Sequence, residues 1–118
     1  MGATTVSLTV KNPAGGENAY TGKFLVDSGA TFTVVPATEL KKLGIKPKRT
    51  IMINLADGRV LEREVGDAIY KYDGIEAASP VMFGKKGDSE LLGIVTLESL
   101  GLSLDPLRRK LYQATLRG

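Results

Sequence analysis

Turn signals divide this chain into short, β-rich segments, and this division constrains the fold more than any other feature. Glycine tolerates the positive φ angles of tight turns, and proline interrupts a strand. Between the turns, apolar residues alternate with polar ones or β-branched residues gather, as is typical of strands. The turn signals are residues 12–16 (Asn-Pro-Ala-Gly-Gly), Asp57-Gly58, Asp73-Gly74 and Asp105-Pro106. The sequence therefore predicts an all-β fold.

Eight strands and two short helices are expected. The strands are residues 4–10, 20–26, 32–35, 50–55, 60–65 with a continuation toward residue 72, 75–83, 102–104 and 110–116. The helices are residues 37–43 and 96–100, which Gly44 and Gly101 end. Both helices carry the pattern Leu-x-x-Leu-Gly, a weak internal repeat. Asp57-Gly58 predicts a hairpin with a type I′ turn, in which both central residues have positive φ.

Length and composition predict one domain over residues 1–118. A chain of this size buries about two thirds of its unfolded surface, enough for one core without disulfides or metals. No apolar stretch approaches the ~20 residues of a membrane span, and the N-terminus lacks a secretory pattern, so a cytoplasmic location without membrane contact is expected. Basic clusters occur at residues 46–49 and 108–110, but few aromatics accompany them, and no nucleic-acid partner is expected.

The chain contains no cysteine and no histidine. This excludes cysteine nucleophiles, Ser-His-Asp triads and Cys/His zinc sites. Any acid–base chemistry must come from Asp, Glu, Lys, Tyr or water. No metal or other cofactor is expected.

Asp27 is the strongest candidate for a catalytic residue. It directly follows the apolar residues 24–26 at the end of an expected strand, a costly place for a carboxylate. Ser28, Gly29 and Ala30 follow it. A structural role is the alternative, in which Asp27 bonds nearby backbone amides in a turn and Gly29 supplies an unusual φ.

The order of motifs resembles that of retropepsin-like aspartic peptidases, most closely the small cellular and bacterial type. An apolar run leads into Asp27-Ser28-Gly29-Ala30, an Asp-Gly hairpin follows, and Leu91-Leu92-Gly93 then precedes a short helix. The resemblance covers nearly the whole chain. It implies a small closed β-barrel that is active as a twofold homodimer and acts on a polypeptide substrate without a cofactor.

The resemblance also implies a role for each matching residue. Asp27 is the catalytic carboxylate, one from each subunit, while Ser28, Gly29 and Ala30 complete the active-site loop. The flap over the substrate consists of Ala56, Asp57, Gly58 and Arg59. The residues that support the loop from behind are Leu91, Leu92 and Gly93. Apolar candidates for the pocket walls are Leu25, Ile53, Leu55, Val81, Phe83 and Leu91, although a plain core role is the stronger interpretation for each of them.

Two carboxylates a few ångströms apart cannot both ionise cheaply, so such a pair holds one proton over a broad pH range. The charged member acts as a general base on a shared water, and the protonated member donates to the scissile carbonyl. Asp27 heads the only Asp-Ser/Thr-Gly in the chain, so dimerisation is required for this chemistry.

Three positions depart from the family pattern. Thr31 and Ile94 stand where viral relatives place an ion pair, and Val95 replaces an aspartate found in many cellular relatives. The flap tip has a single glycine, Gly58. Two other functions stay open: a catalytically silent dimerisation or peptide-binding domain on the same fold, and a basic nucleic-acid module on a small barrel. Phosphate binding would weaken steeply with salt, whereas peptide cleavage would not.

Overall fold

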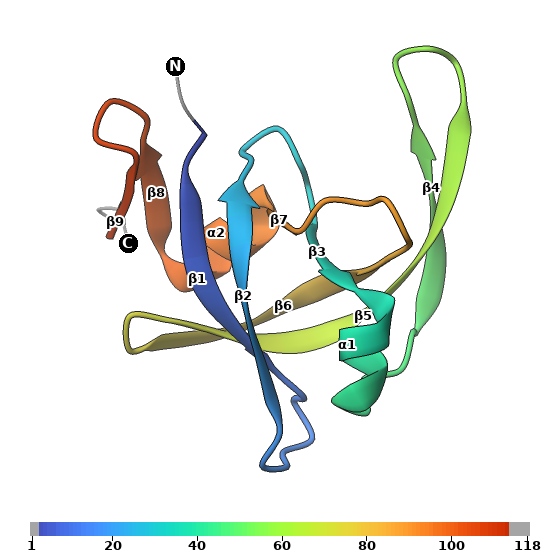
Figure 1. The fold of residues 1–118 in the computed structure, drawn as a ribbon, viewed down its shortest axis with the longest axis horizontal. Helices are drawn as coiled ribbons and strands as arrows, with labels where there is room; N and C mark the ends of the chain where they lie inside the picture. The colour runs from blue at the N-terminus through green and yellow to red at the C-terminus, as the bar shows by residue number, and fades with distance from the viewer. Residues whose placement is uncertain (1–2, 114–118) are drawn as a thin grey trace.

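The computed structural model describes residues 3–113 and shows a mostly β structure with two short helices (Figure 1). The first strands are β1 (Thr5–Lys11), β2 (Ala19–Val26), β3 (Thr33–Pro36), β4 (Arg49–Asn54) and β5 (Val60–Tyr72). The later ones are β6 (Ile75–Gly84), β7 (Leu91–Leu92), β8 (Leu102–Asp105) and β9 (Lys110–Gln113). The helices are α1 (Ala37–Lys42) and α2 (Ile94–Leu100). The predicted all-β class with two short helices is confirmed.

The expected and observed elements differ in two places that matter for the site. The two-residue strand β7 was not expected, and α2 begins at Ile94, two residues before the predicted start. Gly44 and Gly101 end the two helices with positive φ angles of 77° and 71°, as predicted. The last part of the predicted final strand, residues 114–116, lies outside the described residues.

Seven strands form one curled sheet in the order β1-β2-β7-β3-β6-β5-β4, and β8 and β9 form a separate antiparallel pair. The sheet curls because β1 pairs on its other side with β5, over three residue pairs from Thr9↔Lys71 to Lys11↔Ile69. Strand β4 pairs with β5 alone and keeps an open edge. The expected closed barrel is therefore wrong in detail, because the sheet ends in a protruding hairpin, β4–β5.

The short strand β7 separates β2 from β3, although β2 and β3 are consecutive in the chain. It runs parallel to β2, with Leu25 opposite Leu91 and Val26 opposite Leu92. It is antiparallel to β3, with Val34 opposite Leu91. The connection between β2 and β3, residues 27–32, must therefore arch over the end of β7. This arrangement creates the loop that carries Asp27.

The two Asp-Gly hairpins differ from each other in turn type, and the first differs from the prediction. At Asp57-Gly58 only Gly58 has positive φ, 88°, and the Leu55 N–H donates to the Arg59 carbonyl. This is a three-residue loop with glycine in the left-handed position, so the predicted type I′ turn is wrong here. Asp73 and Gly74 both have positive φ, 49° and 82°, and join Tyr72 directly to Ile75. The type I′ signature lies at that second hairpin.

The core lies inside the curl of the sheet and against α2. Its fully buried large side chains come from elements far apart in the sequence. They include Leu8, Phe24, Leu40, Tyr70, Leu92 and Leu97. Val81 and Phe83 also belong to this core, with at most 3% of their surface exposed, so they cannot serve as pocket walls. No helix within residues 3–113 is long and apolar enough to cross a membrane.

Candidate active site

Asp27 lies at the first position after β2, where the chain leaves the sheet. Its side chain is half-buried, and the following Ser28 and Gly29 are exposed. The Oδ1 atom of Asp27 accepts a hydrogen bond from the Gly29 N–H at 2.9 Å, and the Asp27 carbonyl accepts one from the Ala30 N–H at 3.0 Å. The loop is thus a tight turn that presents a carboxylate to solvent.

Backbone hydrogen bonds fix the end of β2 on both sides. The Asp27 N–H donates to the Leu92 carbonyl at 3.0 Å, and the Leu25 N–H donates to the Glu90 carbonyl at 3.0 Å. On the other side the Val26 N–H donates to the Thr4 carbonyl at 2.8 Å. The Leu91-Leu92 motif therefore lies directly beside the strand that leads to Asp27.

The far side of the loop is tied to the start of α2. The Ile94 N–H donates to the Ala30 carbonyl at 2.8 Å, and the Val95 N–H donates to the Thr31 carbonyl at 3.1 Å. The first amides of a helix have no partners within the helix, so the loop carbonyls satisfy them. Within this chain, backbone bonds thus stand at the positions where viral relatives use an ion pair.

Gly93 is required by the close approach of the loop backbone. A Cβ atom at this position would lie 2.5 Å from the Phe32 carbonyl carbon and 2.8 Å from the Thr31 oxygen. Both are backbone atoms, so no side-chain rotation can relieve the clash. The predicted supporting role of Gly93 has a physical reason here: only glycine lets the loop pass this closely over the end of β7.

Three buried hydroxyl groups beneath the loop were not predicted. The Thr33 Oγ1 atom accepts a hydrogen bond from the Gly93 N–H at 3.0 Å and donates to the Thr96 Oγ1 at 2.6 Å. Thr96 in turn lies 3.0 Å from the Ser79 Oγ. Thr33 and Thr96 are fully buried. Tyr70 lies near them, and burial raises the pKa of its hydroxyl well above the ordinary range. The hydroxyl residues are up to 63 residues apart in the sequence, so no local pattern signals that they meet.

An apolar groove runs between the loop and the β4–β5 hairpin. One cavity of about 560 Å³ is bordered by Gly29 and Ala30 on the loop side and by residues 51–54 of β4 on the other. A second cavity of about 370 Å³ adjoins it and shares four side chains with it. The shared residues are Val34, Ile53, Met82 and Leu91. Of the predicted wall residues, Ile53 and Leu91 line both cavities, and Leu55 lines the second.

The predicted flap residues 56–59 lie at the exposed tip of the β4–β5 hairpin. The Oδ1 atom of Asp57 accepts the Arg59 N–H at 3.0 Å, and its Oδ2 atom pairs with the Arg59 Nε at 2.6 Å. Strand β4, and not the tip, borders the cavity beside the Asp27 loop. The structure thus places residues 51–54, the part of β4 that leads to the tip, next to the loop, and the tip residues 56–59 beyond them.

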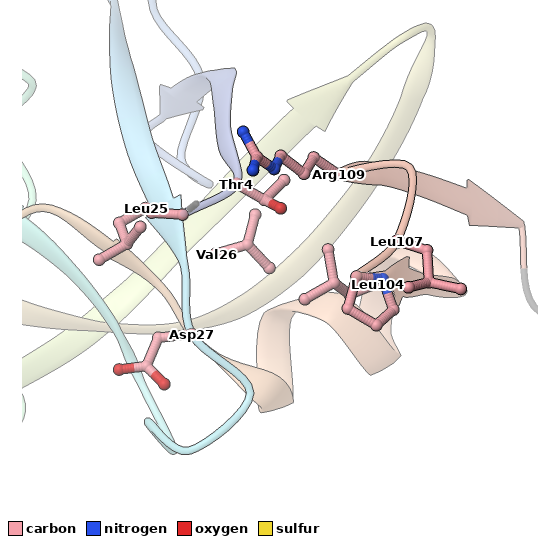
Figure 2. A pocket seen from close by; sticks show the side chains of 9 residues that line it. Thr4, Leu25, Val26, Asp27, Leu104, Leu107 and Arg109 are labelled. Carbon is pink, nitrogen blue, oxygen red and sulfur yellow. The ribbon is translucent and has the colours of Figure 1, made fainter. Parts of the chain in front are cut away.

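A third cavity, of about 480 Å³, lies on the other side of Asp27 (Figure 2). Leu25 and Val26 line it from β2, and the β8–β9 hairpin contributes Leu107 and Arg109. Figure 2 shows the Asp27 carboxylate directed away from the Arg109 guanidinium, which lies beside Thr4. Leu107 is 94% exposed at the hairpin tip. Leu25, a predicted wall residue, borders this cavity, but its side chain is directed to the other side of β2 from Leu104 and Leu107.

The comparisons with known proteins agree with this geometry. Residues 16–99 match the family described as "gag-polyprotein putative aspartyl protease". The chain belongs to this family. A search of curated proteins found no match. Among solved structures, the chain resembles the solution structure of the Simian Foamy Virus (mac) protease, with a TM-score of 0.53 and 24% sequence identity, over 79% of this chain and 92% of that one.

These findings confirm the predicted retropepsin-like family and fold. At this level of identity the solved structure supports the fold alone, whereas the family match identifies the chain as an aspartic-type peptidase in general terms. Retropepsin-like proteases are generally dimeric and act on polypeptides. The catalytic residue, the dimer and the flap stay predictions for this peptidase. Among residues 3–113 no cluster of three or more Asp or Glu side chains is arranged to hold a metal ion.

Proposed function

We propose that the chain is an aspartic endopeptidase that works as a twofold homodimer, with Asp27 of each subunit in one shared site. The observation that carries the proposal is the position of Asp27: it follows the buried Val26 at the end of β2, in a loop locked to β7 and α2, yet its carboxylate reaches solvent. Within residues 3–113 only its Oδ1 atom accepts a hydrogen bond, from Gly29. The other oxygen is open to a water or a partner subunit.

Exposed Ser28 and Gly29 form the outermost part of the same loop. If a twofold axis passes beside this loop, two copies of Asp27 lie close enough to share one proton. The charged carboxylate then removes a proton from a water, and the other protonates the carbonyl oxygen of the scissile peptide bond. The water oxygen bonds to the carbonyl carbon and gives a gem-diol. The carboxyl group that took the proton from water passes it to the peptide nitrogen, the other carboxylate takes a proton back from the gem-diol, and the C–N bond breaks to release an amine and a carboxylic acid.

The apolar groove beside the loop supports an extended polypeptide as the substrate. It lies between Ala30 and the strand β4, and its shared walls are Val34, Ile53 and Leu91. An apolar groove with a few polar groups at one end is typical of a binding site for apolar side chains. The hairpin above it is the predicted flap.

The test is Asp27→Asn, measured on a peptide library at several pH values. Asparagine keeps the shape of aspartate but cannot hold the shared ionisable proton, so cleavage should fall below detection while thermal unfolding and dimer mass stay unchanged. Ser99→Ala is a matched control, since Ser99 is exposed on α2 and donates only to the Val95 carbonyl. Cleavage by Asp27→Asn at the wild-type rate would contradict the assignment.

A silent peptide-binding domain on the same fold is the second candidate. The apolar groove also fits this function, because binding a peptide requires walls and no carboxylate pair. The same library separates the two: a silent domain retains peptides without cutting them, in the wild type and in Asp27→Asn alike.

A further inference from the structure

The β4–β5 hairpin leaves the sheet at Val65. Strand β5 pairs with β6 from Tyr72↔Ile75 as far as Val65↔Met82. Beyond that point, residues 60–64 pair only with β4, in the ladder from Arg49↔Val65 to Asn54↔Val60. Figure 1 shows the hairpin extending beyond the rest of the sheet on one side of the molecule. A hairpin whose two strands pair only with each other needs further contacts to hold its angle.

An ion pair at the base of this hairpin supplies such a contact. The Arg63 Nε donates to the Asp88 Oδ2 at 2.8 Å, and an Arg63 terminal nitrogen donates to the Oδ1 at 2.9 Å. The Asp88 Oδ2 atom also accepts the Lys85 N–H at 2.8 Å. The pair is bidentate and joins β5 to the loop between β6 and β7, residues 85–90, which approaches the hairpin in Figure 1.

This ion pair is better shielded from water than the other ion pairs of residues 3–113. The Arg63 side chain is 10% exposed and that of Asp88 is 25% exposed. The cations of the other pairs are between 37% and 79% exposed. Exposed pairs contribute little because water and salt screen them, whereas a shielded bidentate pair fixes the geometry of the elements it joins.

The pair also borders the substrate groove. Arg63 and Asp88 line the cavity of about 370 Å³, together with Leu55 and Leu61 of the hairpin and Leu91 of β7. The width of this cavity is the gap between the hairpin and the loop that Asp88 belongs to. Because the ion pair spans that gap, it sets the width.

We propose that Arg63 and Asp88 are positioning residues of the peptidase, which hold the β4–β5 hairpin at the width where a substrate side chain fills the groove. This role rests on the proposed function. The two residues touch no reacting atom. They favour the closed position of the hairpin between openings, so the substrate meets a groove whose width is already set. The affinity for substrate therefore benefits more than the chemical step.

The experiment compares the wild type with Arg63→Met and Asp88→Asn. Methionine keeps an apolar stem beside the groove without the charge, and asparagine keeps an acceptor for the Lys85 N–H. Amide exchange of residues 50–62 is measured in the free protein, with the core amides of Leu8 and Tyr70 as internal references. Kinetics on one cleaved peptide give KM and kcat separately. The matched control is Lys11→Met, which removes the exposed ion pair with Glu76 between β1 and β6.

In both variants, amide exchange of residues 50–62 should accelerate about ten- to a hundredfold, while the core amides keep their rates. The KM should rise about tenfold, with kcat within about twofold of the wild type. Arg63→Lys should restore part of both values, since lysine keeps the charge but not the bidentate geometry. Lys11→Met should match the wild type.

Unchanged exchange of residues 50–62 in both variants would overturn the proposal, whatever the kinetics. Faster exchange with an unchanged KM would also overturn it, because the pair would then be structural only. A wild type that cleaves no peptide would contradict the proposed function instead. In that case the exchange result would still decide whether Arg63 and Asp88 hold the hairpin.

Discussion

The Asp27 loop and the β4–β5 hairpin border the same groove, yet they are held in different ways. The loop is fixed by backbone hydrogen bonds to β7 and α2 and by the fully buried Thr33 and Thr96 beneath it. Beyond Val65 the two strands of the hairpin pair only with each other. The hairpin is tied to the body through side chains: the Arg63–Asp88 ion pair, and Arg49, whose guanidinium carbon lies 5.9 Å from the centroid of the Phe32 ring.

This difference agrees with the tasks that the two regions would have in a peptidase. A catalytic carboxylate loses rate when its position shifts by even a small distance, so its support must be rigid. A cover over the substrate must open to admit a polypeptide, so its contacts must be few and reversible. Mutations beneath the loop should therefore affect the whole fold, whereas mutations at the hairpin should affect binding.

The largest effect is expected at Gly93. Gly93→Ala places a Cβ about 2.5 Å from the Phe32 backbone, so the loop must move or the domain must unfold. We expect a loss of several kcal/mol in the free energy of unfolding, about 3 or more, and no detectable cleavage. Chemical denaturation measures this loss. The comparison variant is Gly29→Ala, whose Cβ would lie 3.2 Å from the Asp27 Oδ1 and should cost far less stability. Equal losses in the two variants would contradict the account.

The next largest effect is expected for Thr33→Val, which removes the acceptor of the Gly93 N–H. A buried donor left without a partner costs about 1–3 kcal/mol in the free energy of unfolding. Thr9→Val is the control, because the Thr9–Thr21 hydroxyl contact is exposed, and its loss should stay within about 0.5 kcal/mol. Similar losses for both threonines would show that the buried hydroxyls do not support the loop.

Local patterns predicted most of the strands and the Asp27 loop because these depend on neighbouring residues. Strand β2 ends where its apolar run ends, and the glycines at positions 44 and 101 end their helices. The insertion of β7 between β2 and β3 was not predictable, since two residues with parallel pairing leave no periodicity. The position of the turn at Asp57-Gly58 was predicted, but its type was not. The loop has three residues because it includes Ala56, and a loop of this kind needs a positive φ only at Gly58.

The contacts that support the candidate site were missed for a related reason. Thr33 and Thr96 lie 63 residues apart, and Arg63 and Asp88 lie 25 apart. Threonine in a β-rich segment and charges in a polar loop are ordinary in a sequence, so neither stood out. Their roles follow only from the fold, which brings buried hydroxyls under one loop and opposite charges across one groove.

A smaller effect is expected at position 30, which tests the chemistry of the rigid loop and not its stability. Alanine has no donor for the Asp27 carboxylate that we propose as catalytic, so we expect a bell-shaped pH–rate profile with an optimum at about pH 4–6. Ala30→Ser adds a hydroxyl next to Asp27 and should shift the acidic limb downward by about one to two pH units. The profile of kcat against pH measures the shift. A wild-type optimum near about pH 2 would contradict this explanation.

The smallest effect concerns the hairpin in acid. The hydrogen bonds from Arg63 hold the pKa of Asp88 below its ordinary value of 3.8, and the nearby Lys85 acts in the same direction. A carboxylate with a depressed pKa stabilises the fold above its unfolded pKa, and this stabilisation is lost as the pH falls through the folded pKa. Amide exchange of residues 50–62, corrected for its intrinsic pH dependence, should therefore stay constant above the ordinary pKa of 3.8 and accelerate as the pH falls below it. In Asp88→Asn this acceleration of amide exchange at low pH should be absent. If the variant still shows it, another titrating group causes the acceleration.

The central claim is that one active site needs Asp27 from two chains. Mixing wild-type and Asp27→Asn subunits, with time for subunit exchange and at constant total concentration, tests it directly. Random pairing of an equal mixture leaves about one quarter of the dimers with two copies of Asp27. The rate of peptide cleavage should therefore fall to about one quarter of the wild-type rate. Across mixtures it should follow the square of the fraction of wild-type subunits. A rate of about one half, linear in the wild-type fraction, would mean that each chain acts alone and would contradict the account.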